Sequence, residues 1–498
     1  MSTDLKNVSP VYDIAIVSPL ERASKLSTLL GCDIYLKRED LQPVHSFKLR
    51  GAYNKIASLT KTQKEAGIIT ASAGNHAQGV ALAAKKLKLK ATIVMPATTP
   101  QIKMDAVRSY GAKVILFGDS YSDCYDHAQE VMTETGMTFV HPFDDEKVIE
   151  GQATIATEIL DELSDVTHVF IPIGGGGLIA GMSQVLKTAN KKIIVIGVEP
   201  EDSNAMQQSL KAKKVLTLDH VGIFADGVAV KTVGKKTFVL TQKYVDKVIT
   251  VDNDEICAAI KRIFEQTRAI CEPAGALAVA GATKYFSRQS KKNDGVKAVC
   301  VNSGANITFE RLQFVTERTL IGMKSESIFA ITLPERPGAL KKLYKDVIHG
   351  FAISEFSYRL ATRDKANIFI GLLTGNEEKK EIVIDRLHKH KFDFVDLSHD
   401  DYAKEHVRFM IGGKSLDAKN ERFYSFNFPE RPGALRDFLD AIHNRFNISL
   451  FHYRGQGGDT GQVLMGFEAE NVGELEETLK EAGYEFEQVK SKAISAFL

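Results

Sequence analysis

The residue whose chemistry stands out first is Lys48, in the segment HSFKLRGA at residues 45–52. It follows the strand-like run Ile34–Leu36 and precedes a helical pattern at residues 53–59. If Ser46 caps that helix, Lys48 lies in its first turn, where the positive end of the helix dipole lowers the pKa of an ammonium group. A neutral lysine amine is a nucleophile that forms Schiff bases with carbonyls. Because most lysines keep their charge in water, this prediction depends on the rest of the chain.

A second candidate is the segment TASAGNHAQG at residues 70–79, which follows a predicted strand and opens a helix. Its small residues allow close backbone approach, and amides at a helix N-terminus attract an anion such as a carboxylate. A plain strand-to-helix turn accounts for Gly74 and for a capping Asn75. It does not account for so many small and polar residues together with His76, so an anion site is favoured.

Four consecutive glycines, Gly174 to Gly177, precede Leu178 between a predicted strand and a predicted helix. Such a run costs backbone entropy, and a simple turn needs only one or two glycines. Amides without side chains beside a helix start form a phosphate-binding nest. The segment lacks the Lys-Ser/Thr pair of a nucleotide P-loop and the spacing of a dinucleotide fingerprint. It therefore predicts a phosphate site without identifying the phosphate.

Two further motifs carry single polar groups. Ser303, in NSGAN at residues 302–306, could donate its hydroxyl to a ring nitrogen or cap a following helix, and alone the cap is favoured. Glu272, in EPAGA at residues 272–276, precedes a proline that starts a helix, which a helix-start device explains.

In combination, a Schiff-base lysine, a carboxylate loop, a phosphate nest and a hydroxyl for a ring nitrogen describe pyridoxal phosphate with a bound amino acid. The segments HSFKLRGA, TASAGNHAQG, GGGGL, EPAGA and CVNSGAN resemble, in this order, the threonine and serine dehydratases of the tryptophan-synthase-β fold type. The resemblance covers roughly the first 320 residues. It implies a fold type II catalytic region of two three-layer α/β subdomains.

The same resemblance implies roles for individual residues. Lys48 would hold the cofactor as a Schiff base and then move the Cα proton, while Phe47 would lie against the cofactor ring. Asn75 would bond the ring hydroxyl, and Ser303 would face the pyridine nitrogen. A neutral hydroxyl there leaves a weaker electron sink, which favours prompt loss of a β-hydroxyl over transamination. No metal ligand is expected. The phosphate would lie on Gly174, Gly175, Gly176, Gly177 and Leu178, and the substrate carboxylate on Ser72, Asn75 and His76.

Short apolar runs alternate with helical patterns from about residue 68 to residue 303. Such alternation predicts a mostly parallel sheet covered on both faces, with ligands at the carboxyl ends of the strands. The expected strands are 68–70, 92–95, 114–117, 168–173, 193–198 and 298–301. The expected helices are 77–87, 101–110, 121–135 and 149–163.

The last third of the chain repeats itself. The segment PERPGAL occurs at residues 334–340 and again, ninety-five residues later, at 429–435. The same offset pairs residues 351–359 with 446–454, which share the pattern FxISxFxYR, so the repeat is an internal duplication. Each copy predicts the ferredoxin-like order βαββαβ, with first helices at 340–348 and 435–442 and second helices at 380–388 and 472–481.

This tail resembles the paired ACT-like regulatory subdomains of biosynthetic threonine deaminases, which bind isoleucine and often valine. The Pro-Gly turns at helix starts offer amides for an amino-acid carboxylate. A module serving mainly for dimerisation is the alternative. The expected organisation is a catalytic domain at 1–322 with a small subdomain at about 53–150. It continues with ACT-like α+β subdomains at 323–402 and 421–498, joined by a linker at 403–420.

Composition excludes several other classes. The 498 residues carry a net charge of +1 without a basic block, so neither nucleic acid nor an anionic membrane is expected as a partner. Five scattered cysteines lack metal-ligand spacing and indicate a reducing compartment. No secretory signal or membrane-spanning apolar run is evident, so a cytoplasmic protein is expected.

The hypothesis is a biosynthetic threonine ammonia-lyase that converts L-threonine to 2-oxobutanoate and ammonia, the first committed step of isoleucine biosynthesis, with feedback by isoleucine. The duplicated tail carries the biosynthetic assignment, because catabolic dehydratases and serine racemases of this family usually lack it. A related enzyme acting chiefly on L-serine and a non-catalytic amino-acid sensor are the alternatives. A homotetramer is expected from the family alone.

Overall fold

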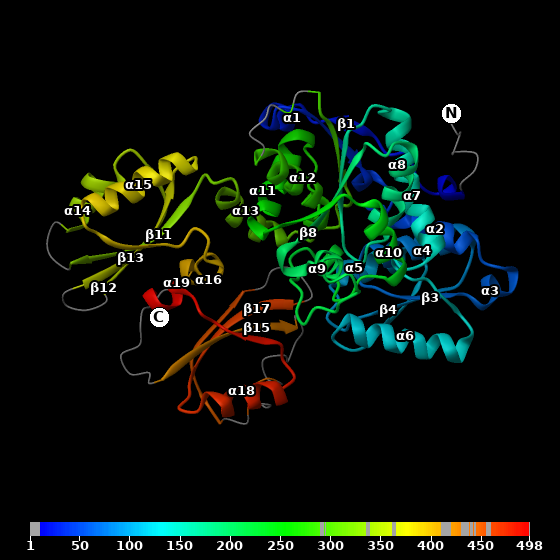
Figure 1. Cartoon of the computed structure of the whole chain (residues 1–498). Coiled ribbons are helices and arrows are strands. Elements are labelled where there is room, and N and C mark those ends of the chain that lie inside the picture. The colour runs from blue at the N-terminus through cyan, green and yellow to red at the C-terminus, as the bar shows by residue number, and fades with distance from the viewer. Residues whose placement is uncertain are drawn as a thin grey trace. The chain divides into compact units, whose positions relative to one another are not determined.

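The computed structural model describes residues 10–288, 293, 295–334, 339–360, 365–409, 420–429, 438, 442, 445–454 and 460–497 (Figure 1). The chain forms two compact units, Met1–Thr308 and Phe309–Leu498. Helix α13 (Arg311–Gly322) belongs to the second unit, so the two units divide before residue 322, where the predicted catalytic domain ends. The predicted domain boundaries stay predictions. In the described part, no helix is long and apolar enough to cross a membrane.

The first unit contains a six-stranded sheet in the order β1-β2-β10-β7-β8-β9, in which only β1 is antiparallel. Val169 and Ile171 of β7 pack in one core with helices α7 (Glu146–Glu162) and α8 (Gly177–Ala189), while Phe170 meets Phe286 of helix α12 (Pro273–Ser287). Because alternate strand residues point to opposite faces, these helices cover the two faces of the sheet. The strands are β1 (Leu20–Arg22), β2 (Asp33–Arg38), β7 (His168–Pro172), β8 (Ile194–Pro200), β9 (Lys247–Val251) and β10 (Lys297–Asn302).

A second, four-stranded parallel sheet has the order β5-β4-β3-β6. Ile68 and Ile93 pack with helices α4 and α5, whereas Ile69 and Val94 pack with helix α6. The first unit thus consists of two three-layer α/β subdomains, as the fold class predicted. The strands are β3 (Ile68–Ala71), β4 (Ala91–Met95), β5 (Lys113–Leu116) and β6 (Thr138–Phe139).

The helices of the first unit are short or of moderate length, and one of them, α2 (Lys48–Ala57), packs closely on both α4 and α7. Glycines allow this approach, because a Cβ on Gly79 would lie 3.0 Å from Leu49 N and one on Gly151 would lie 2.6 Å from Arg50 O. The others are α1 (Ser24–Leu30), α3 (Lys61–Ala66), α4 (Asn75–Leu87), α5 (Gln101–Ser109), α6 (Tyr121–Thr135), α7 (Glu146–Glu162), α8 (Gly177–Ala189), α9 (Ala205–Ala212), α10 (Lys235–Tyr244), α11 (Asn253–Thr267) and α12 (Pro273–Ser287).

The second unit contains two antiparallel sheets of the same topology, β12-β13-β11-β14 and β16-β17-β15-β18. Each has a register shift at the same point of the repeat, between Ile353 and Glu355 and between Ile448 and Leu450. The predicted duplication is therefore present in three dimensions. The elements are β11 (Ser327–Pro334), α14 (Ala339–Leu343), β12 (Ala352–Leu360), β13 (Lys365–Leu373), α15 (Glu377–Lys389), β14 (Asp393–Asp396), β15 (Glu421–Pro429), β16 (Asn447–Arg454), β17 (Thr460–Glu468), α18 (Val472–Glu481) and β18 (Phe486–Gln488).

The two copies share a hydrophobic cluster that includes Phe369 and Leu464, and short helices α16 (Asp401–Glu405) and α19 (Lys492–Phe497) contribute to it. Several predictions lie outside the described residues. These are the two Pro-Gly turns at 337–338 and 432–433, most of the helix at 435–442, and most of the linker at 403–420.

Candidate active site

Lys48 is the first residue of helix α2, so it occupies the first turn, as the sequence predicts. The predicted cap is wrong, because Phe47 takes the N-cap position in helical backbone geometry without a side-chain cap hydrogen bond. Ser46 instead forms a bridge to Gly304. Its buried hydroxyl makes no hydrogen bond within the described part of the chain.

The amine of Lys48 lies in a confined setting. Nζ donates to Pro142 O at 3.5 Å and lies 5.2 Å from the centre of the Phe47 ring. Burial lowers the pKa of this amine to about 8, and the negative charge of Glu272 opposes the shift. Burial, rather than the helix dipole invoked from the sequence, is thus the main cause. Near neutral pH, a substantial fraction of the amine is in the nucleophilic form.

A loop after strand β10 holds the segment that carries Lys48. Phe47 N donates to Ser303 O at 3.2 Å, and Ala305 N donates to His45 O at 2.9 Å. Glu272 N donates to Gly304 O at 3.1 Å, which adds the start of helix α12 to the same cluster. Three motifs that are far apart in the sequence therefore meet in one place.

Asn75 and Glu272 form a polar chain beside this loop. Asn75 Nδ2 donates to Glu272 Oε1 at 2.6 Å, and Asn306 Nδ2 donates to Asn75 Oδ1 at 2.6 Å. Glu272 is the N-cap of α12 but its side chain makes no cap bond, so the helix-start interpretation fails to explain its carboxylate. The sequence singled out Glu272 only as a helix-start residue and not as a site residue. The available signal was its acidic side chain in the small-residue motif EPAGA, which occurs together with the lysine, glycine and serine motifs of the site.

The glycine run forms a loop between β7 and α8. Gly176 has φ 94°, and added Cβ atoms on Gly174, Gly175 and Gly176 would lie 2.3–2.9 Å from Val228, the Phe143 ring or Met206. In the described residues, the amides of these three glycines donate no hydrogen bond to other protein groups. The loop therefore presents several donors with no competing side chains, which suits a phosphate.

The segment at residues 141–145 connects the loop to Lys48, and it was not singled out from the sequence. His141 Nδ1 accepts hydrogen bonds from Phe143 N and Asp144 N, and burial lowers the pKa of the imidazole. The Asp144 carboxylate accepts from the amides of Lys235, Lys236 and Thr237 at the start of α10. Thr237 Oγ1 in turn donates to Gly175 O at 2.6 Å.

The remaining predicted residues lie at the carboxyl ends of strands β3 and β10. Ser72 Oγ accepts from Gly74 N at 3.2 Å, and Ser303 Oγ donates to Ala274 O at 3.3 Å. His76 Nε2 lies 2.9 Å from Val140 O. Burial, followed by the charge of Lys48, lowers the pKa of His76 to about 3, so the ring is neutral at physiological pH. The predicted roles of these side chains stay predictions.

Comparison with known proteins identifies the kind of molecule that carries this arrangement. Residues 12–304 match the family model "Pyridoxal-phosphate dependent enzyme", and residues 317–407 and 412–498 match "C-terminal regulatory domain of Threonine dehydratase". Biosynthetic L-threonine dehydratases of Pasteurella multocida and Escherichia coli are 48% and 46% identical over 98% of this chain, which covers 96% and 95% of their lengths. The chain belongs to the family of biosynthetic threonine dehydratases.

A solved structure supports the same assignment for the first unit. The processed form of threonine deaminase isoform 2 from Solanum lycopersicum is 50% identical and has a TM-score of 0.61, covering 63% of this chain and 90% of that one. Maize serine racemase is 32% identical with a TM-score of 0.59 over 62% of this chain and 94% of its own. The catalytic fold is therefore shared between dehydratases and racemases.

The residues of this dehydratase site fit pyridoxal phosphate, the cofactor of the family. Within the described residues, the amides of Gly174, Gly175 and Gly176 donate to no protein group, so they are available for a phosphate. Lys48 supplies an amine of lowered pKa for an aldehyde. Ser303 supplies a neutral hydroxyl directly after the end of β10.

Proposed function

We propose that the chain converts L-threonine to 2-oxobutanoate and ammonia, using pyridoxal phosphate. The observation that carries the proposal is the confined Lys48 amine, which shares one site with the glycine loop and the Asn75–Glu272 chain. The names of the relatives supply the substrate. Loss of the β-hydroxyl with one proton gives an enamine, and hydrolysis of its imine tautomer releases ammonia, so water is removed and then regained.

The cofactor, when bound, supplies an electron sink that makes loss of the Cα proton and of the β-hydroxyl possible. The chain supplies binding and orientation. The amides of Gly174, Gly175 and Gly176 would hold the phosphate, and Lys48 would hold the aldehyde carbon. Burial lowers the pKa of the free Lys48 amine to about 8, so this amine could accept a proton near neutral pH when it is not bound to the cofactor.

The second unit would act as a regulatory module that binds isoleucine, with valine as a possible antagonist. The match to the regulatory domain of threonine dehydratase supports this assignment. An effector shifts activity only if it binds two conformational states unequally, and such coupling is typically about 1–3 kcal/mol. A threonine titration with and without isoleucine tests it, and superimposable curves would remove the feedback claim.

L-Serine is the second candidate substrate, because the fold is shared with serine racemase at 32% identity.

We further propose that the protein forms a homotetramer in the cytoplasm. The five cysteines are buried and form no disulfide in the described structure, which is consistent with a reducing compartment.

The test uses the full-length protein with its cofactor and compares kcat/KM for threonine and serine, with identification of the 2-oxo acid released. The proposal expects 2-oxobutanoate from threonine at the higher kcat/KM. A higher kcat/KM for serine would transfer the assignment to serine dehydration. Absence of any 2-oxo acid from both substrates would overturn the proposed activity.

A further inference from the structure

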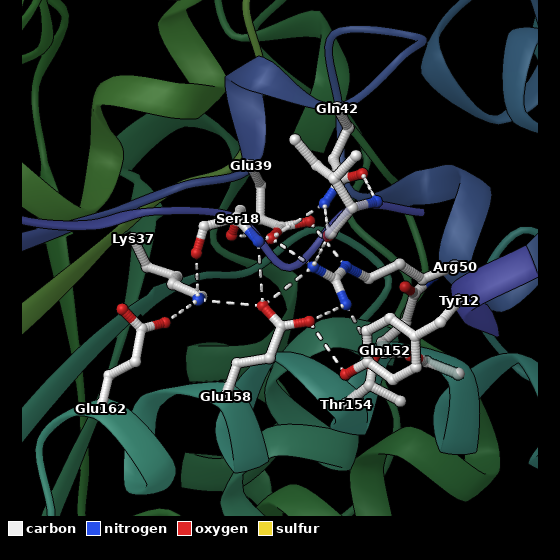
Figure 2. A network of polar contacts seen from close by, with 12 residues as sticks. Tyr12, Ser18, Lys37, Glu39, Gln42, Arg50, Gln152, Thr154, Glu158 and Glu162 are labelled. Atoms are coloured by element: carbon white, nitrogen blue, oxygen red, sulfur yellow. Dashed lines mark hydrogen bonds and ion pairs between the residues drawn. The ribbon is translucent and has the colours of Figure 1, made fainter. Parts of the chain in front are cut away.

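A cluster of buried charges surrounds Arg50, two residues after Lys48 in helix α2 (Figure 2). The guanidinium is fully buried and forms a fork with Glu39, in which Nε and Nη2 donate to the two carboxylate oxygens at 2.8 Å each. Its Nη1 donates to Glu158 Oε1 at 2.5 Å, and Nη2 donates to Glu158 Oε2 at 3.1 Å. Burial opposes the charge, but the two carboxylates outweigh burial and raise the pKa of Arg50.

A second cation completes the cluster. Lys37 Nζ lies 2.9 Å from Glu158 Oε2 and donates to Ser18 O at 2.5 Å. Lys37, Arg50, Glu39 and Glu158 are all at most 4% exposed, so two positive and two negative charges are buried together. Tyr12 OH donates to Glu158 Oε1 at 2.9 Å, so the N-terminal segment takes part as well.

The cluster joins α2 to four other parts of the first unit. These are the N-terminal segment at residues 10–18, strand β2, the turn at Glu39–Leu41 and helix α7, as Figure 2 shows. Arg50 Nη2 also donates to Ile16 O at 3.1 Å, which fixes the N-terminal segment against the same group. A forked guanidinium specifies direction as well as distance. The contacts of Arg50 therefore fix the position and the rotation of the first turn of α2 within the first unit.

Lys48 lies between this cluster and the loop after β10. On one side Phe47 N donates to Ser303 O, and on the other Arg50 N donates to Phe47 O at 3.0 Å while its side chain enters the cluster. In the described structure no atom of the cluster contacts the Lys48 amine, and the geometric link between Arg50 and that amine is the backbone of α2.

We propose that Arg50 is a positioning residue that sets the place and the proton affinity of the Lys48 amine through the cluster. The inference rests on the proposed function of Lys48 as the cofactor anchor. Buried ion clusters are a weak source of stability compared with apolar packing, so their presence here is better explained by the geometry that they impose. A displacement of about 1 Å at a reacting group can cost about 10²-fold in rate.

The experiment replaces Arg50 by lysine, which keeps the charge but loses the fork. The full-length Arg50→Lys protein is expected to show kcat for threonine lowered at least about tenfold with KM changed less than about twofold. In the cofactor-free chain, the pH of half-maximal capture of pyridoxal phosphate, followed by visible absorbance, is expected to move from the wild-type value.

The matched control is Arg318→Lys in the second unit. Arg318 is 3% exposed and pairs with Glu405 and Asp401, so the substitution makes the same chemical change within the other unit of the chain. This variant is expected to lower the urea midpoint while kcat without effectors and the capture pH stay at their wild-type values. If Arg50→Lys lowers only the urea midpoint and leaves both readouts unchanged, the positioning role is overturned.

Tyr12→Phe keeps the proposal testable if Arg50→Lys does not fold, because it removes a single hydroxyl from the far side of the cluster. The kcat of Tyr12→Phe is expected to fall to about a half or a third of the wild-type value at unchanged KM. An unchanged kcat would overturn the inference. The Lys48→Ala protein separates the two proposals. If Lys48→Ala retains covalently held cofactor, the assignment of Lys48 as the anchor is overturned. If Lys48→Ala loses the cofactor while the Arg50 and Tyr12 variants behave like the wild type, only the positioning role of Arg50 is overturned.

Discussion

Lys48 and Arg50 lie two residues apart at the start of helix α2, and their surroundings shift their pKa values in opposite directions. Within the described residues, no carboxylate is hydrogen-bonded to the Lys48 amine, and burial lowers the pKa of that amine to about 8. Arg50 has two buried carboxylates, and they raise its pKa despite burial. The difference shows how one turn of helix can carry both a reactive amine and a permanent charge.

The contrast also separates chemistry from support. The Lys48 amine gains reactivity because its charge is poorly compensated, at a cost in stability. In the Arg50 cluster, each of the four buried charges is paired with a buried opposite charge, so the cluster supports helix α2 rather than the chemistry. The predictions below change one side of this contrast at a time.

The largest effect is expected for Lys48→Ala, which removes the amine and leaves the Arg50 cluster intact. The protein should fold, lose covalently held cofactor, and lose turnover by at least about 10²–10⁴-fold, the range for a lost acid–base group. Lys85→Ala is a suitable control, because Lys85 lies on α4 and its amine contacts Ser109 O and the Tyr110 ring. Retained turnover in Lys48→Ala would place the anchor elsewhere.

Arg50→Met should cause the largest loss of stability. It leaves Glu39 and Glu158 buried beside a single cation, and breaking such a cluster costs about 3–5 kcal/mol in the free energy of unfolding. Urea unfolding measures it. The exposed pair Arg22–Asp33 provides the comparison, since Arg22→Met should change the free energy of unfolding little. Equal losses in the two variants would contradict the special status of the cluster.

Lys48→Met should stabilise the cofactor-free chain. The pKa of Lys48 falls from 10.5 to about 8 on folding, so below pH 8 the fold carries a charged amine at a cost of about 3 kcal/mol. The cost disappears as the pH rises from 8 towards 10.5. The gain in unfolding free energy should therefore be largest at pH 7 and shrink above pH 8. A gain that does not depend on pH would contradict this cause.

Glu272→Gln should have a smaller effect, on pH dependence. The charge of Glu272 raises the pKa of Lys48 against the effect of burial, so its removal should lower that pKa further. The pH profile of cofactor capture would move to lower pH. The amide can still accept a hydrogen bond from Asn75, which limits other changes. A shift to higher pH would show that the sign of this interaction is wrong.

Local patterns predicted much of this molecule. The helix at residues 121–135 has the predicted bounds, and β13 (Lys365–Leu373) and β17 (Thr460–Glu468) are ninety-five residues apart, as the repeat requires. Periodicity and turn chemistry act over a few residues, so they can be read from the chain.

Long-range contacts were not predictable in the same way. Asp144 caps a helix that begins at Lys235, and Arg50 reaches Glu158, so no local signal identifies either partner. The expected Ser46 cap was wrong because the bridge to Gly304 holds that residue instead. Glu272 was interpreted as a helix-start device because its partner, Asn75, lies 197 residues away.

The most direct test of the central claim is to locate the cofactor on the chain. The full-length protein with pyridoxal phosphate is reduced with borohydride, which fixes a Schiff base, and digested for peptide mass analysis. The added mass should lie on Lys48 in the peptide that carries HSFKLRGA. Labelling of a different lysine, with Lys48 unmodified, would contradict the assignment of this site.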